Sequence, residues 1–345
     1  MKFLLLLPLF RVIPVSVSAL EIQAPIVPES GSRWMPQNTD SFLDGLAELW
    51  EEAFRIMGPE MRQTAYAASS ILLATILIAF IRILSGKEKH AADMIGAFVV
   101  ASIFLKTSHS LISLAAETIR ELNSYGKLLF PVMATAMAAH GGVTASAALY
   151  SGTVVLDSVL GSIMSEMLIP VIYLFVAIAV MYTATGQSLL KRIREAVKNS
   201  VSWFLKTLLT MYTTYMSITG VVSGTTDAAA LKAAKVTISS VVPVVGGILS
   251  DASESVLVGA GVLKNAAGVY GILAVMAVCL EPFLKIGIQY LVLKVVSVLC
   301  CVFAEGGITA LTEDFSTAMG LLLAMTGTMC LLLLISTVCF MKGVG

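Results

Sequence analysis

Long apolar runs separated by short polar segments fill most of this 345-residue chain. A helix needs about 20 predominantly apolar residues to cross a bilayer. Windows near that length, with shorter ones bounded by Gly or Pro, predict an all-α, polytopic integral membrane protein with roughly seven to nine membrane helices, some broken or re-entrant. The apolar windows are 66–84, 91–105, 128–139, 143–164, 170–185, 203–222, 241–249, 255–263, 266–280, 282–303 and 318–341.

Two of the short windows carry helix-breaking residues. Window 128–139 is too short to span a bilayer comfortably and is followed by Gly141-Gly142. In window 241–249, Pro243 precedes Gly246 and Gly247. Irregular backbone at membrane depth is tolerated only where protein or water satisfies its polar groups. We therefore expect the broken helices at 131–142 and 243–254 to border a polar path.

The first 19 residues have the pattern of a signal peptide. Lys2 precedes an apolar run, and residues 17–19 are small or compact, as signal peptidase requires. Arg11 interrupts the apolar region, so an uncleaved anchor is the alternative. Either interpretation places the next segment outside the cytoplasm.

Residues 20–65 form a polar, mainly acidic segment before the multi-spanning domain at 66–345. Few basic residues are expected of an exported stretch. Several prolines predict an extended linker at 24–38. Ser41 then begins an amphipathic helix that is predicted to stop at Gly58-Pro59, and that rests either on a membrane or partner surface or on the protein's own loops.

Composition supports lipid as the solvent. Hydrophobic residues make up 57% of the chain and charged residues 13%, with a mean hydropathy of +0.91, whereas soluble domains average about 25% charged. A net charge of zero argues against a nucleic-acid partner, which needs a concentrated basic face. All five cysteines lie in or at the edges of apolar runs and are expected to be buried small hydrophobes rather than disulfides.

Basic clusters predict which loops are cytoplasmic. One cluster follows window 66–84 and includes Lys87, and the other occupies 191–198. For the C-terminus the charge rule prefers Glu305, Glu313 and Asp314 outside with Lys342 inside. An internal repeat, described next, prefers the opposite arrangement, and the charges carry slightly more weight.

The repeat would relate 128–185 to 240–303. Pro131 and Pro170 are separated by the same interval as Pro243 and Pro282, although the other identities are few. Transporter folds are often built from such duplicated units. Small residues on the helices of both halves predict close helix approach, within the protomer or between copies; they include Gly152, Gly161, Gly268 and Gly271.

Ionisable residues inside apolar segments are candidate functional groups, because they are costly there. The candidate pore or gating residues are Asp157, Pro243, Gly246, Gly247, Asp251 and Glu254. For Asp251 and Glu254, the alternative is a helix cap at the interface. Zinc-protease, phosphate-loop and nucleophile–histidine motifs do not occur, so we expect neither catalysis nor a cofactor.

The block at 224–271 resembles the stage III sporulation protein AE family of endospore-forming bacteria. The resemblance rests on Gly224-Thr225-Thr226-Asp227 with the alanines and Lys232 that follow, then on 238–240 and 243–247. It implies a protein of the mother-cell membrane around the forespore, acting with other channel subunits, a separate ATPase among them. It also implies a permease-like or pore-forming role.

Two functions therefore compete. In the first, the chain is a channel or export-gate subunit, expected to assemble with copies of itself in the bilayer. In the second, it is a non-conducting scaffold that anchors other subunits through its acidic exported helix and basic cytoplasmic loop.

Overall fold

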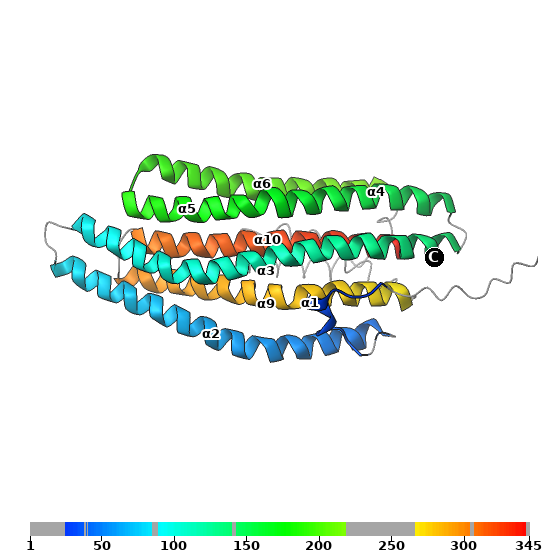
Figure 1. Cartoon of the computed structure of the whole chain (residues 1–345), viewed down its shortest axis with the longest axis horizontal. Helices are drawn as coiled ribbons and strands as arrows, with labels where there is room; N and C mark the ends of the chain where they lie inside the picture. The colour runs from blue at the N-terminus through cyan, green and yellow to red at the C-terminus, as the bar shows by residue number, and fades with distance from the viewer. Residues whose placement is uncertain are drawn as a thin grey trace, which may run out of the picture.

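The computed structural model describes residues 25–37, 39, 41–84, 89–139, 143–218, 266–303 and 307–342. These residues form an elongated bundle in which the long helices lie roughly side by side (Figure 1). Within the described part every regular element is helical, so the predicted all-α class is confirmed. The elements are α1 (Glu29–Ser32), α2 (Phe42–Leu84), α3 (Lys89–Ala139), α4 (Val143–Ser162), the π-helical segment η1 (Ile163–Leu168), α5 (Ile169–Thr185), α6 (Ser188–Ile218), α9 (Ala266–Phe303) and α10 (Gly307–Lys342).

Several features predicted from the sequence fall outside the described residues. They are the signal peptide at 1–19, the Gly141-Gly142 break and most of the block at 224–271. The same holds for windows 241–249 and 255–263, and thus for residues 240–265 of the second repeat unit.

Helices longer than a bilayer replace the predicted series of short pieces. At about 1.5 Å per residue, the 51 residues of α3 extend about 76 Å, against about 30 Å for a hydrocarbon core. α3 joins windows 91–105 and 128–139 into one helix, and α9 joins 266–280 and 282–303. The predicted re-entrant helix at 128–139 and the separate crossings in α9 are therefore wrong.

Proline does not end these helices, because packing holds both sides of it. Pro131 lies inside α3, where Leu129, Phe130 and Met133 are all buried. An interior proline removes one backbone hydrogen bond and bends a helix. Tertiary burial on both sides opposes the break that local propensity predicts.

The N-terminal region also differs from the prediction. α2 continues through Pro59 to Leu84 instead of stopping at Gly58-Pro59, and it bows along its length (Figure 1). The predicted linker contains α1, which packs on α9 so closely that a Cβ on Gly31 would lie 2.9 Å from the backbone nitrogen of Val278.

Five helices in the described residues are long and apolar enough to cross a membrane. They cover Phe42–Ile81, Met94–Thr135, Tyr150–Thr185, Gly268–Val302 and Gly307–Met341. α6 contains residues 203–218 of the predicted crossing at 203–222 and is not among them, because polar residues such as Lys206, Thr207 and Thr210 lower its hydropathy; residues 219–222 lie outside the described residues. The larger number of seven to nine crossings stays a prediction.

α10 forms the centre of the bundle. It contacts α3, α4, α5, α6 and α9, and every side chain from Asp314 to Met341 is buried. Burial of its leucines and methionines removes a large apolar area from solvent, the main stabilising contribution in such a core. The middle of one protomer is thus filled by side chains in the part that the structure describes.

The basic cluster of α6 and the acidic start of α10 lie at the same end of the bundle. The turn at Gly186 between α5 and α6, the end of α2 and the start of α10 lie at the same end, and α10 finishes at the opposite end (Figure 1). Arg194, in the basic cluster of α6, is 2.5 Å from Asp314. The basic cluster and the acidic start of α10 are therefore on one side, and Lys342 is on the other.

A cytoplasmic basic cluster and acidic residues on the outer side, as the charges predicted, do not fit together in this arrangement, because the two lie at one end. Two of the three acidic residues, Asp314 and Glu313, have basic partners, and Glu305 lies outside the described residues. Asp314 pairs with Arg194, and Glu313 lies 3.6 Å from Lys294 of α9. Acidic residues in any case orient membrane helices poorly.

Candidate functional site

Asp157 is the predicted site residue that the structure describes, and it lies where α4, α6 and α10 meet. Its side chain is 3% exposed. Ser336 of α10 donates a hydrogen bond to Asp157 Oδ2 at 3.2 Å, and Tyr212 of α6 hydrogen-bonds with the same serine hydroxyl. We call Thr153, Asp157, Tyr212 and Ser336 the polar cluster.

Two oxygen atoms of this cluster have no hydrogen-bond partner in the structure. One is Asp157 Oδ1, and the other is Oγ1 of Thr153, which lies one helical turn earlier on α4 and is 1% exposed. Residues four apart share a face of a helix. Buried polar atoms are almost always hydrogen-bonded, so two orphans on one face point to a missing group.

A tyrosine side chain connects α6 to α4 beside the cluster. A Cβ on Gly152 would overlap the hydroxyl group of Tyr215, so this side chain reaches the backbone of α4. Tyr212 is one turn before Tyr215 on α6 and hydrogen-bonds within the cluster. Close approach of the helices is confirmed at Gly161, which packs on α3, because a Cβ added there would lie 2.7 Å from Cγ of Asn123.

A π-helical segment follows the cluster directly. Residues Ile163–Leu168 continue α4 into α5 with one wider turn, a feature found frequently at functional sites. Glu166 lies on this turn and is exposed, so it does not join the polar cluster.

Other ionisable residues within the apolar segments of α9 are paired. Glu281 and Lys285 of α9 lie 2.7 Å apart, and Trp34 donates from its indole nitrogen to the same glutamate at 3.4 Å. Lys294 pairs with Glu313. In the described residues, Asp157 differs from these because none of the ion pairs includes it.

A second polar feature runs along the outside of α3. Polar side chains recur every three or four residues, and all are exposed, while the opposite face buries Ile112, Ile119 and Leu122. The members of this α3 polar face are Lys106, His109, Ser110, Glu117, Arg120, Ser124 and Lys127. The face lies within the candidate span Met94–Thr135.

The α3 polar face was only partly visible in the sequence. The amphipathic stretch 113–125 predicted polar positions at Glu117 and Arg120. Lys106 and His109 looked like a gradual end of window 91–105, and Lys127 was not singled out. Which side of a long continuous helix is exposed is decided by its neighbours in the fold. Glu121 is half-buried and accepts a hydrogen bond from Ser30.

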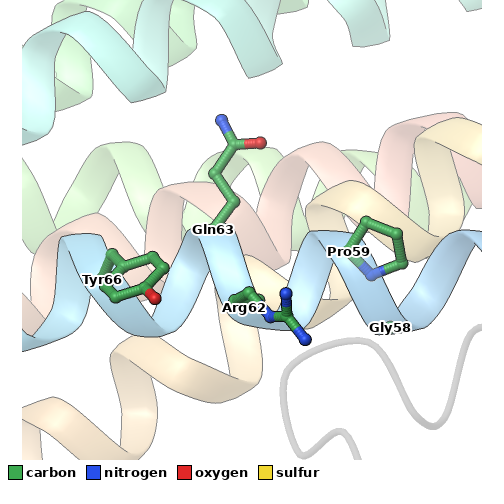
Figure 2. Close-up of a pocket in the computed structure, with 5 residues that line it drawn as sticks. All are labelled: Gly58, Pro59, Arg62, Gln63 and Tyr66. Atoms are coloured by element: carbon green, nitrogen blue, oxygen red, sulfur yellow. The ribbon is translucent and has the colours of Figure 1, made fainter.

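A surface pocket lies on α2 beside Pro59. It is lined by Gly58, Pro59, Arg62, Gln63 and Tyr66, which all belong to one helix and do not converge on a common point (Figure 2). Polar groups that fix a ligand usually converge from several elements. The described residues thus give this pocket no chemistry of its own.

The remaining predicted site residues lie outside the described residues. They are Pro243, Gly246, Gly247, Asp251 and Glu254. Their two interpretations, conduit lining or helix cap, both stay predictions. No group of three His, Cys, Asp or Glu side chains suited to a metal ion occurs in the described part of the chain.

Comparison with known proteins identifies the family. Stage III sporulation protein AE of Bacillus subtilis (strain 168) is 23% identical over 243 residues, which cover 69% of this chain and 61% of that protein. The match thus spans less than two thirds of the relative's length. No solved structure matches the chain. The family model for stage III sporulation protein AE matches residues 38–343, so the chain belongs to the stage III sporulation protein AE family.

Proposed function

We propose that this chain is a channel or permease-like membrane subunit of the complex that joins the sporulating mother cell to the forespore. Membership of the sporulation family and the five candidate spans support a membrane role in sporulation. The observation that carries the conducting role is the α3 polar face.

A charged side chain that faces lipid costs about 2.5–3.5 kcal/mol at the centre of a helix on insertion scales. Lys106, Glu117, Arg120 and Lys127 all expose charge on one face of a candidate span. Wherever this face passes through the hydrocarbon core, it requires water or a polar partner beside it. A water-filled path along α3 meets this requirement for all of these residues at once.

The path lies between copies of the chain in this proposal. α10 fills the middle of the protomer, whereas the α3 polar face is on the outside. A ring of copies that turns this face inward encloses water and leaves the apolar outer faces of α2 and α9 to lipid. The energy for transport comes from a separate ATPase subunit, consistent with the lack of a phosphate-loop motif in this chain.

The basic end of the bundle supports one orientation in the mother-cell membrane for this proposal. The positive-inside rule places the α5–α6 turn and the start of α10 in the cytoplasm. The segment before α2 and the end of α10 are then extracytoplasmic, with a signal peptide at 1–19 directing export.

A non-conducting scaffold is the second candidate. The observation that favours it is the first half of α2, which exposes Trp50 and Phe54 in edge-to-face contact beside the acidic residue Glu51. Exposed aromatic residues of this kind are enriched in protein interfaces. In that case partners attach there and the α3 polar face contacts another subunit rather than water.

Cysteine labelling of the purified full-length chain in proteoliposomes separates the two. Single cysteines replace Ser110 or Ser124 after the exposed Cys301 is changed to Ser. Leu174→Cys is the matched control, because Leu174 is exposed on α5 next to Tyr173, whose ring centroid is 6.1 Å from that of His109. The control position is therefore at a similar distance along the bundle to Ser110.

For a conduit we expect a membrane-impermeant thiol reagent to label both serine positions and to spare Leu174→Cys. We also expect a bulky adduct at Ser110→Cys to slow the exchange of a small polar dye. Unlabelled serine positions, or labelling without any effect on dye exchange, would contradict the conducting role.

A further inference from the structure

We propose that the polar cluster binds a small monovalent cation, with Na⁺ as the ion that it fits. The oxygen atoms come from Thr153 and Asp157 of α4, Tyr212 of α6 and Ser336 of α10. This site is separate from the α3 polar face and does not depend on whether the chain conducts.

Charge balance is the first argument. Asp157 is 3% exposed, and none of the ion pairs in the described residues reaches it. A buried carboxylate without a counter-charge is strongly disfavoured. Asp314 shows the contrasting solution, because Arg194 of a neighbouring helix neutralises it at 2.5 Å.

The second argument is the position of the unpartnered oxygen atoms. Asp157 Oδ1 and Thr153 Oγ1 are both buried, both lack a partner, and lie one turn apart on the same face of α4. Buried threonines elsewhere in the bundle bond their own helix, as Thr337 does to the Leu333 carbonyl at 2.7 Å. The Thr153 hydroxyl is therefore free for another ligand.

The donor set decides the class of ion. Every available atom is a carboxylate, hydroxyl or phenol oxygen, which suits hard cations and not transition metals. Ca²⁺ takes six to eight oxygen ligands, and either Ca²⁺ or Mg²⁺ beside a single carboxylate would leave a net buried charge. One carboxylate neutralises one monovalent cation.

Helix packing makes the site rigid. The Tyr215 side chain of α6 lies against Gly152 of α4, and Ser336 Oγ is also 2.7 Å from the Leu332 carbonyl oxygen of its own helix. The Leu332 carbonyl is a further oxygen at the cluster, 3.4 Å from Tyr212 Oη. Cation binding here joins α4, α6 and α10.

The test uses the purified full-length chain in detergent. Thermal unfolding is followed in NaCl, KCl and choline chloride at equal ionic strength and fixed pH, and Na⁺ binding is measured by calorimetry. We expect Na⁺ to raise Tm in a saturable manner that choline does not reproduce, because an ion that binds only the folded state stabilises it.

Substitutions then locate the ion. Asp157→Asn should abolish the Na⁺ response while its Tm in choline stays at or above that of the unmodified chain, because the unpaired charge is gone. Thr153→Val should weaken Na⁺ binding about tenfold, the result of losing about 1.4 kcal/mol. Thr337→Val is the matched control, one residue from Ser336, and should leave the response unchanged.

Three results would overturn the proposal. One is equal Tm in all three salts. Another is a Tm that depends on pH through Asp157 but not on Na⁺, which would mean that a proton alone neutralises the carboxylate. A third is an undiminished Na⁺ response in Asp157→Asn. If that variant does not fold, an undiminished response in both Thr153→Val and Ser336→Ala overturns the proposal instead.

Discussion

Arg194 of α6 and Asp314 of α10 form a nearly buried ion pair at the basic end of the bundle. Their side chains are 13% and 10% exposed, and Arg194 Nη1 is 2.5 Å from Asp314 Oδ2. The guanidinium also lies over the ring of Tyr182 of α5, 4.7 Å from its centroid. The pair thus connects three helices.

Arg194→Ala should destabilise the fold by about 3 kcal/mol, because it leaves a nearly buried carboxylate without a partner. Arg194→Lys should recover only part of the loss, since lysine lacks the planar group that stacks on Tyr182. Denaturant unfolding in detergent measures both. The double variant Arg194→Ala with Asp314→Ala should be more stable than Arg194→Ala alone; a less stable double variant would contradict this explanation.

Gly152→Ala should displace the Tyr215 side chain of α6 from α4. The added Cβ would overlap the Tyr215 hydroxyl, while the next atom, Tyr215 Cζ, lies 2.9 Å away. Overpacking of this kind costs about 1–3 kcal/mol. Adding Tyr215→Phe removes the overlapping oxygen and should restore part of the lost stability in thermal unfolding.

Gly287→Ala serves as the control for that experiment. A Cβ at Gly287 would meet nothing within 4 Å, and the residue lies inside α9. Alanine is favoured over glycine in a helix by about 1 kcal/mol, so this change should be neutral or stabilising. Equal destabilisation by both substitutions would show that contact with Tyr215 is not the cause.

Gly31→Ala should release the segment that crosses α9. Space for a side chain at Gly31 is blocked by Val278, whose backbone nitrogen is 2.9 Å from the Cβ position and cannot rotate away. The contacts of Ser30 with Glu121 and of Trp34 with Glu281 should weaken together. Limited proteolysis should cut faster near residues 25–37 in this variant than in Gly58→Ala, where a Cβ meets nothing within 4 Å.

Glu117→Leu combined with Arg120→Leu should abolish spore formation while the protein still accumulates in the membrane. The two positions are exposed, so apolar side chains there create no cavity or clash. They do remove charge from the proposed water-facing surface. Leu128→Gln, also on the exposed side of α3, is the control and should sporulate normally. Normal spore yield in the double variant would remove the α3 polar face from the mechanism.

Local pattern predicted much of this protein. The helical class and the membrane setting follow from composition and from the length of runs such as 318–341, which became the fully buried part of α10. Asp157 was also found from sequence, because an acidic residue inside an apolar run is costly wherever the helix packs. The helix end predicted at Gly58-Pro59 and the break between the windows at Pro282 were wrong, and at Pro282 the reason is that propensity ignores the packing on either side.

The sequence by itself determined that the chain is helical and needs lipid, because both depend on neighbours along the chain. Only the tertiary structure decided which polar groups meet. Asp157 and Ser336 are separated by 179 residues, and Arg194 and Asp314 by 120. The local pattern of apolar and polar positions cannot predict contacts between residues so far apart in the sequence. Packing of α10 among its neighbours leaves Asp157 without a counter-charge, gives Asp314 an arginine and keeps the polar side of α3 on the outside.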